Sequence, residues 1–309
     1  MRIIFLGSGG FGIPTLERIA NDHAVVCVVT QPDRPAGRKR VPTATDAGQW
    51  AAEHNVDLIK TDNVNTPDLV TRFEQASADA AVAIAFGQKI ADPTIDALGG
   101  LVVNLHGSLL PRYRGAAPIN WAMIRGERET GNTVIALAQK MDAGVMYDQQ
   151  KTSIDPNETA GELHDRLARL GPGQIERVLR AFAGGSLQGV EQDESLATRA
   201  PKLSKADGVV EFGGTPDAVR SRIHGLTPWP GVCVSSVSTG RELLLRRVCS
   251  VPDMPHGCEP GTVIDGRHVA VCGGAIELLQ VQPPGKRVMS IDDYNRGHAL
   301  PVGDVLHSG

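Results

Sequence analysis

Long apolar runs are absent from this 309-residue sequence, and no stretch reaches the eighteen or so residues that a membrane-spanning helix needs. The N-terminus also lacks the order of charged, apolar and cleavable segments found in secretory signals, and it is not an Arg/Ser-rich presequence. The composition, with 41% hydrophobic and 21% charged residues, is typical of globular proteins. We therefore expect a cytoplasmic protein that does not bind a membrane.

Cysteine is sparse, and its five occurrences contain no CxxC pair. An odd count in a chain without a secretory signal argues against a disulfide framework or a zinc cluster. None of the nine histidines lies in an HExxH motif or at a Cys/His ligand spacing. We expect no metal, and most cysteines should be small buried apolar residues.

An excess of positive charge is lacking as well, because the net charge is −4 at pH 7. A polyanionic partner would therefore have to be held by local basic patches. The densest comprises Arg34, Arg38, Lys39 and Arg40, and lesser ones are Lys202 with Lys205, Arg246 with Arg247, and Lys286 with Arg287. Patches of this kind are more often solvated surface than binding sites.

Short β-branched runs alternate with helical periodicity from Arg2 to about Gly185. The runs predict strands at 3–6, 24–30, 80–85, 101–105, 133–139 and 145–154. The periodicity predicts helices at 14–20, 67–76, 117–124 and 159–182, the last interrupted by Gly171-Pro172-Gly173. This alternation indicates an α/β fold with a mostly parallel, doubly wound sheet.

A polar segment without clear periodicity, 186–206, predicts a linker between a first domain at 1–185 and a second at 207–309. In the second domain, the turn-forming residues Gly, Pro and Asp frequently separate short strand-like runs. Its short strands are expected at 209–212, 232–237, 243–248, 263–264, 269–272 and 276–281. This pattern predicts a small closed sheet or β-barrel with one or two short helices.

The stretch LVVNLHGSLLPRYRGAAPINW, residues 101–121, contains the polar groups best placed for chemistry. Asn104 and His106 are two residues apart on a buried strand, so they should project from one face at its carboxyl end, where open α/β sheets bind ligands. Gly107 and Pro111 favour a looped backbone after the strand, and Leu109 and Leu110 suit a pocket for a flat, partly apolar molecule.

Asp142, in a turn after a later strand, adds a carboxylate to this set. Asn, His and Asp without a poised Ser or Cys are a poor set for covalent catalysis, because nothing serves as the nucleophile. They are well suited to polarising a carbonyl and moving a proton. The set indicates direct transfer of a group from a carrier to an amine, although Asn104 and Asp142 could each simply cap a turn.

The run NLHGSLLPRYRGAAPINW, with MDAG after it, resembles the folate-dependent formyltransferases. The resemblance implies a Rossmann-like catalytic domain whose catalytic trio falls on Asn104, His106 and Asp142. It also implies that Ser108, Leu109, Leu110 and Pro111 contact the folate.

Four further motifs are similar to those of family members that formylate methionyl-tRNA: TQPDRPAGRKR (30–40), PKLSKADG (201–208), TPWPG (227–231) and LLQVQPPGKRVMS (278–290). The resemblance then implies 10-formyltetrahydrofolate as donor and the α-amino group of initiator methionyl-tRNA as acceptor. It implies an oligonucleotide-binding-like barrel that grips the tRNA, with contacts from Arg34, Arg38, Lys39, Arg40, Arg246, Arg247, Lys286 and Arg287. We expect the chain to act as a monomer.

The glycines Gly7, Gly9 and Gly12 spell GxGxxG after the first strand, which is typical of dinucleotide sites. The acidic residue that would hold the ribose is missing from the end of the second strand, since Asp33 follows a proline inside the basic loop. We therefore expect that the protein binds no NAD. The glycines should instead allow a tight turn from the strand into the helix.

Four alternatives remain open on the sequence. They are a formyltransferase acting on a nucleotide-linked amino sugar, a hydrolase releasing formate from the carrier, an NAD-dependent oxidoreductase and a tRNA-binding protein without catalysis. The last leaves Asn104, His106 and Asp142 unexplained.

Overall fold

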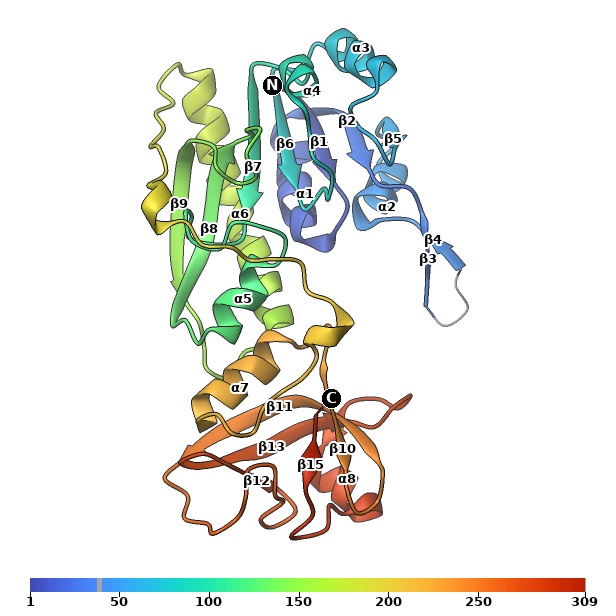
Figure 1. Cartoon of the computed structure of the whole chain (residues 1–309). Helices are drawn as coiled ribbons and strands as arrows, with labels where there is room; N and C mark the ends of the chain where they lie inside the picture. Colours follow the sequence, from blue (N-terminus) through green and yellow to red (C-terminus); the bar gives the residue numbers. More distant parts are fainter. Residues whose placement is uncertain (38–40, 309) are drawn as a thin grey trace. The chain divides into compact units, whose positions relative to one another are not determined.

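A computed structural model describes residues 1–37 and 41–308 (Figure 1). The chain forms two compact units, and it passes between them more than once. The first unit comprises Met1–Pro118, Gly131–Thr152 and His164–Ala200, and the second comprises Ile119–Thr130, Ser153–Leu163 and the chain from Pro201 onward. The chain passes to the second unit for the last time between Ala200 and Pro201, inside the segment expected to be a linker. The limits of the two domains stay a prediction.

The first unit contains a seven-stranded sheet in the order β5-β2-β1-β6-β7-β8-β9. Its strands are β1 (Arg2–Gly7), β2 (Ala24–Thr30), β5 (Leu58–Lys60), β6 (Ala80–Ile84), β7 (Leu101–His106), β8 (Glu129–Ala136) and β9 (Met146–Ser153). The first five in the chain pair in parallel, and β8 is antiparallel to β7. This confirms the doubly wound, mostly parallel, Rossmann-like sheet.

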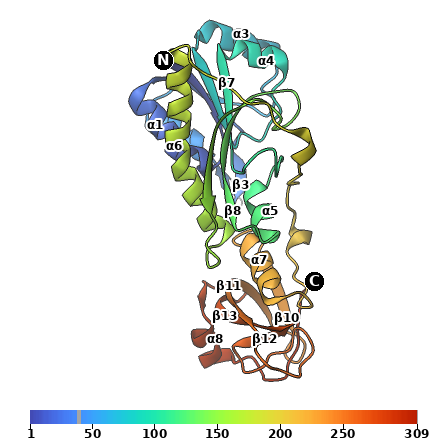
Figure 2. The same ribbon diagram turned by 90° about the vertical axis from the view of Figure 1, so that its left-hand side faces the viewer.

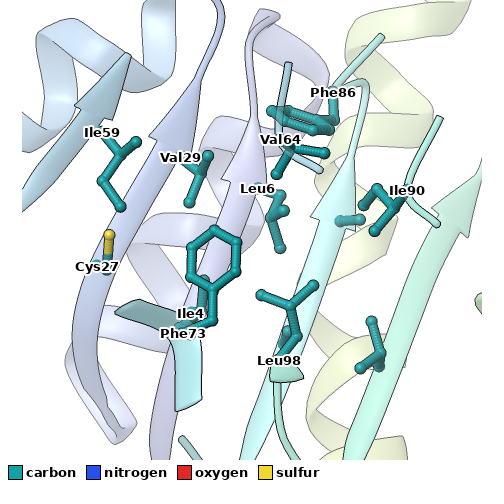
Figure 3. Packing of buried hydrophobic residues seen from close by; sticks show 13 residues of the cluster. Ile4, Leu6, Cys27, Val29, Ile59, Val64, Phe73, Phe86, Ile90 and Leu98 are labelled. Carbon is teal, nitrogen blue, oxygen red and sulfur yellow. The ribbon is translucent and has the colours of Figure 1, made fainter. Parts of the chain in front are cut away.

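Both faces of this sheet are covered at its centre, where β1 and β6 are apolar and buried along nearly their whole length. The helices of the first unit are α1 (Ile13–Asp22), α2 (Asp46–Glu53), α3 (Pro67–Ala76), α4 (Asp92–Ala97) and most of α6 (Ala160–Ala183), while α5 (Pro118–Ile124) belongs to the second unit except for its first residue. On one face, Phe73 of α3 packs among Ile4, Leu6, Val29 and neighbouring side chains (Figure 3). Figure 2 shows α6 running along the sheet beside β8.

The Gly-rich turn after β1 is shaped by close packing. A Cβ added to Gly7 would lie 2.5 Å from the ring of Phe5, and one added to Gly12 would lie 2.9 Å from the same ring. Asp33 does not stand at the end of β2 as a ribose ligand; it pairs with Lys60 at 2.6 Å, next to the hairpin of β3 (Arg34–Ala36) and β4 (Val41–Thr43). The glycines therefore bring the following helix close to the sheet.

The expected interruption of the long helix is wrong, because α6 is continuous through Gly171-Pro172-Gly173. A Cβ on Gly171 would lie 2.5 Å from Leu105 and 2.9 Å from the hydroxyl of Thr15. Glycine here lets α6 approach β7 closely. Pro172 costs one main-chain hydrogen bond, but its fixed φ is compatible with a helix.

The second unit contains a six-stranded antiparallel sheet in the order β12-β13-β11-β10-β15, with β14 paired to β13. Its elements are α7 (Pro216–Gly225), β10 (Val232–Ser236), β11 (Glu242–Pro252), β12 (His268–Val271), β13 (Gly274–Gln282), β14 (Met289–Ser290), α8 (Ile291–His298) and β15 (Leu306–His307). Val263 bridges to Val269 at one edge and Thr262 bridges to Val305 at the other, so the sheet curls into a barrel. The predicted β-barrel is confirmed.

The strand predicted at 209–212 is wrong, since these residues form no regular element. Their apolar character has another cause: Val210 and Phe212 are buried in the second unit, and the Val210 amide donates to the hydroxyl of Ser308. Across 1–37 and 41–308, no helix combines the length and apolarity that crossing a membrane requires.

His224 of α7 is buried without charge in the second unit. The amide of Val248 donates to its Nε2 at 3.1 Å, which requires that nitrogen to be unprotonated. Burial, with the nearby charges of Arg220 and Arg247, lowers the pKa of His224 from 6.5 to about 4. The pKa of His224 is lower in the folded protein than in the unfolded chain, so as the pH falls the unfolded chain protonates this histidine first. The contribution of neutral His224 to the free energy of unfolding is therefore complete above about pH 6.5 and declines toward pH 4.

We expect this residue to make the protein acid-labile. Between pH 7 and pH 5 the wild type should lose about 2 kcal/mol more unfolding free energy than His224→Gln, whose side-chain oxygen can accept the Val248 amide without titrating. Denaturant unfolding of both proteins at the two pH values measures the difference. An equal acid loss in the two proteins would contradict this role for His224.

Candidate active site

Asn104 and His106 occupy the carboxyl end of β7, as predicted, and lie on one face of that strand because side chains alternate along it. The strand is flanked by β6 and β8, so both residues sit within the sheet and not at its edge. His106 is buried and Asn104 is half-buried. A rigid strand thus fixes the backbone of both groups.

The ring of His106 is oriented by a backbone carbonyl. Its Nε2 lies 2.9 Å from the carbonyl oxygen of Tyr113. A carbonyl only accepts hydrogen bonds, so Nε2 must carry a proton and Nδ1 faces the other way. Tyr113 presents this carbonyl from a left-handed backbone conformation, with φ of 63°.

The loop that carries Tyr113 is tied to β8. The hydroxyl of Thr133, the residue opposite His106 in the β7–β8 register, donates to the carbonyl of Ser108 at 2.7 Å. The same hydroxyl accepts the amide of Leu110 at 3.1 Å. The loop is therefore positioned by the strand that lies beside the histidine.

The structure brings Asp142 to His106, although Asp142 lies 36 residues later in the chain. Asp142 Oδ2 lies 3.6 Å from His106 Nδ1 and accepts the amide of Gly115 at 2.8 Å. The His–Asp separation exceeds a hydrogen bond, so Nδ1 is not fully engaged and can still interact with a substrate.

The side-chain amide of Asn104 has no hydrogen-bond partner within the part of the chain that the structure describes. Its neighbours across the sheet are Ala83 of β6 and Ile135 of β8, neither of which offers a side-chain polar group. The amide is therefore available to donate to a bound molecule. A joint role for Asn104, His106 and Asp142 stays a prediction.

The residues expected to contact a folate differ in exposure. Ser108 and Leu110 are buried, and the hydroxyl of Ser108 donates to the carbonyl of Arg112 at 2.8 Å. Leu109 and Pro111 are half-buried. A ligand can therefore reach Leu109 and Pro111 more readily than Ser108 or Leu110, and all four contacts stay a prediction.

Sequence reasoning missed the loop after β6. In doubly wound sheets, ligands bind where the strand order reverses, which here is between β1 and β6. Ala85, with φ of 49°, and Gly87, with φ of 78°, turn the chain at that point. Gln31 holds the loop by donating to the carbonyl of Phe86 at 2.9 Å. The reversal follows from the order of strands and helices, so the topology could have revealed it.

The candidate basic residues fall into three groups. Arg34, Lys286 and Arg287 are exposed. Arg246 donates to Gln282 and to the carbonyl of Pro228, and Arg247 pairs with Glu162 at 2.5 Å, so both are partly used by the protein itself. Arg38, Lys39 and Arg40 lie outside the described residues. Among the described residues, no cluster of three His, Cys, Asp or Glu side chains could hold a metal ion.

Comparison with known families identifies both parts of the chain. Residues 1–179 match the family described as "Formyl transferase", and residues 202–299 match "Formyl transferase, C-terminal domain". Methionyl-tRNA formyltransferase of Geotalea uraniireducens is 35% identical, covering 99% of this chain and 98% of its own. The enzyme of the same name from Geobacter sulfurreducens is 37% identical, covering 99% and 96%.

Solved structures share the fold at much lower identity. The N-formyltransferase from Helicobacter canadensis, in complex with folinic acid and dTDP-3-aminofucose, is 14% identical with a TM-score of 0.69, covering 89% of this chain and 98% of that one. A sugar 3N-formyl transferase, solved with dTDP and 5-N-formyl-THF, is 15% identical with a TM-score of 0.67, covering 93% and 99%.

The turn that carries Asp142 should tolerate no side chain at Gly144. A Cβ there would lie 1.9 Å from the carbonyl oxygen of Ala136, so Gly144→Ala must move the β8–β9 connection. Overpacking of this kind costs about 1–3 kcal/mol. Gly173→Ala is the matched control, since its Cβ meets nothing closer than 3.6 Å inside α6 and alanine favours a helix. Thermal unfolding should show a lower Tm for Gly144→Ala alone; equal Tm values would contradict the close packing.

Proposed function

Because the chain belongs to the formyl transferase family, as a methionyl-tRNA formyltransferase, we propose which of its residues carry the formyl transfer and what they contact. The enzyme formylates the methionyl group of initiator tRNA, a step of translation initiation and one-carbon metabolism. We propose 10-formyltetrahydrofolate as its formyl donor and the cytoplasm as its location. No metal or NAD takes part in the proposed reaction, and the monomeric state stays a prediction.

The observation that carries the residue assignment is the placement of His106. Its Nε2 is held by the Tyr113 carbonyl at 2.9 Å, while its Nδ1 stands 3.6 Å from Asp142 without a full hydrogen bond. The amide of Asn104, which has no partner among residues 1–37 and 41–308, is on the same face of β7. The site thus offers two donors, one neutral and one that becomes cationic, for a single developing negative charge.

Asn104 and His106 stabilise the oxyanion in the proposed mechanism. The neutral α-amino nitrogen of methionine attacks the formyl carbon, a C–N bond forms, and the carbonyl oxygen becomes negative. The Asn104 amide and the Nδ1–H of protonated His106 donate to that oxygen. Collapse of the tetrahedral centre breaks the bond between the formyl carbon and the nitrogen of the carrier.

Asp142 supports the charge on His106 and helps to move the proton. Its carboxylate stabilises the imidazolium across 3.6 Å, and the Gly115 amide fixes the carboxylate by donating to the same oxygen. The proton that leaves the amine passes through water near Asp142 to the departing nitrogen of the carrier, so protons balance. No formyl-enzyme forms in this mechanism, because the attacking group is the amine of methionine and not a side chain of the protein.

The loop residues Ser108, Leu109, Leu110 and Pro111, which follow β7, are proposed to contact the folate. Half-buried Leu109 and Pro111 offer apolar contact to its ring, and Ser108 and Leu110 shape the loop from inside. The turn at Ala85–Gly87 stands at the point where strand order reverses, and we include it in the folate site.

The tRNA is proposed to contact exposed basic groups in both units. Arg34 is exposed on the first unit, where it begins β3, and Lys286 and Arg287 are exposed on the second. Arg38, Lys39 and Arg40 are part of the same proposal on sequence alone, as are Arg246 and Arg247, which are partly engaged within the protein. The net charge of −4 makes these local groups more important, because the whole molecule does not attract a polyanion.

Replacing His106 tests its role in chemistry. With saturating formyl donor and methionyl-tRNA, His106→Ala should lower kcat by about two to four orders of magnitude, because it removes both a donor to the oxyanion and its positive charge. The Kd for methionyl-tRNA, measured by filter binding, should stay within about twofold of wild type. His54→Ala, which removes an exposed histidine of the same unit, is the control. Collapse of tRNA binding without loss of single-turnover rate would contradict the assignment.

The proposed phosphate contacts predict a salt effect. Arg287→Gln should weaken methionyl-tRNA binding and reduce the slope of log Kd against log salt by about one, because one fewer counterion is released. The control is Arg18→Gln on the first unit, which removes a surface arginine that pairs with Asp22 of the same helix. This variant should leave the slope unchanged. Identical slopes for wild type and Arg287→Gln would exclude Arg287 as a phosphate contact.

A further inference from the structure

The segment that follows α6 lies across both loops of the active site. Val190 exchanges two backbone hydrogen bonds of 2.9 Å with Met146, just after the turn that carries Asp142. Farther along, Arg114 and Ala200 are joined by a 2.7 Å backbone bond, and Thr198 accepts the amide of Arg114 at 2.8 Å. Residues 190–200 therefore connect the Tyr113–Gly115 loop with the Asp142 turn.

Gln192 is the side chain that joins the two loops within this segment. Its Nε2 donates to the backbone carbonyls of Asp142 and Gly144, both at 2.8 Å. Its Oε1 accepts two bonds from the guanidinium of Arg114, at 3.0 and 2.7 Å. Gln192 and Arg114 are each only 8% exposed, so these bonds are made away from bulk water.

The charge of Arg114 is balanced in the same network. Its Nη2 lies 2.8 Å from Glu194, which also pairs with Lys140. These two cations hold the pKa of Glu194 down at about 2, so the carboxylate stays charged at every working pH. A buried arginine with a permanent counter-charge is a fixed anchor for the oxygen of Gln192.

The turn to which Gln192 donates its hydrogen bonds has a strained backbone and carries Asp142, which is proposed above to act in catalysis. Asp142 has φ of 53°, a left-handed conformation that costs a non-glycine residue free energy and persists only when surrounding contacts impose it. The Gly115 amide holds its carboxylate, and Gln192 holds its backbone. Without the second contact, the turn can relax and the 3.6 Å approach of Asp142 to His106 is lost.

We propose that Gln192 is a positioning residue for formyl transfer, which fixes Asp142 against His106 by joining its turn to Arg114. This inference rests on the catalytic role proposed above for Asp142. Gln192 does not touch the reacting atoms in this arrangement. Its contribution should therefore appear in kcat and not in the affinity for either substrate.

Gln192→Glu separates positioning from simple packing. The variant keeps the size of the side chain and strengthens the bonds from Arg114, but a carboxylate cannot donate to the carbonyls of Asp142 and Gly144 and repels both. We expect kcat to fall about 10- to 100-fold, the loss that a displacement of about 1 Å produces in a catalytic group. KM for the folate and for methionyl-tRNA should stay within about twofold of wild type.

A double-mutant cycle with Asp142→Asn identifies the residue through which Gln192 acts. If Gln192 works by placing the Asp142 carboxylate, Gln192→Glu should lower kcat by no more than about twofold in the Asp142→Asn background. A second cycle uses Gln192→Met, because the introduced glutamate could disturb folding. Methionine has no charge, and its side chain donates no hydrogen bond and accepts only weakly. Gln139→Met, on the same β8–β9 connection but exposed, is the control and should retain wild-type kcat.

Each result has one meaning. Wild-type kcat in both Gln192→Glu and Gln192→Met would overturn the proposal, and so would a full loss that persists in the Asp142→Asn background. Wild-type kcat in Asp142→Asn alone would instead refute the role of Asp142, which is a separate failure of the proposed function. Circular dichroism melting of every variant confirms that the kcat values belong to folded protein.

Discussion

The hydrogen bond from His106 Nε2 to the carbonyl of Tyr113 is the interaction on which the site depends. It fixes which ring nitrogen carries the permanent proton, and so it leaves Nδ1 as the atom that faces Asp142 and the substrate. The bond exists because the chain turns through a left-handed residue at Tyr113 and because Thr133 ties the loop to β8. The Rossmann-like sheet supplies the rigid strand, and the loop after it supplies the chemistry.

Much of the fold could be predicted because its signals are local. β-Branched runs and helical periodicity reveal β2 and α3 with their limits as observed, and β1, β6 and β7 to within a residue or two. Signals that depend on tertiary packing were misleading: Gly171-Pro172-Gly173 suggests a break, but Gly171 is needed for the approach of α6 to Leu105. Likewise Val210 and Phe212 are apolar because they are buried, without forming a strand. The return of 119–130 and 153–163 to the second unit leaves no mark in the composition.

The site was predictable only where its groups share a strand. Asn104 and His106 are two residues apart, so strand geometry alone places them together, whereas nothing in the spacing of Asp142 places it beside them, and it joins the set only on its chemistry and on the family resemblance. Tyr113 acts through its backbone carbonyl, which every residue has, so no side-chain pattern could indicate it. Gln192 acts from a segment that looks like a polar linker, and its partners lie 50 and 78 residues away in the chain. Long-range contacts of this kind require the folded structure.

The most direct test of this account is the tautomer of His106, read from ¹⁵N NMR of protein labelled in its histidine rings, with His106→Gln used to assign the signals. The account predicts that the neutral ring carries its proton on Nε2, because the Tyr113 carbonyl can only accept. Acid should then add the second proton at Nδ1, the nitrogen beside Asp142. A neutral ring protonated on Nδ1 would contradict the account, since the nitrogen assigned to the oxyanion and to Asp142 would be the wrong one.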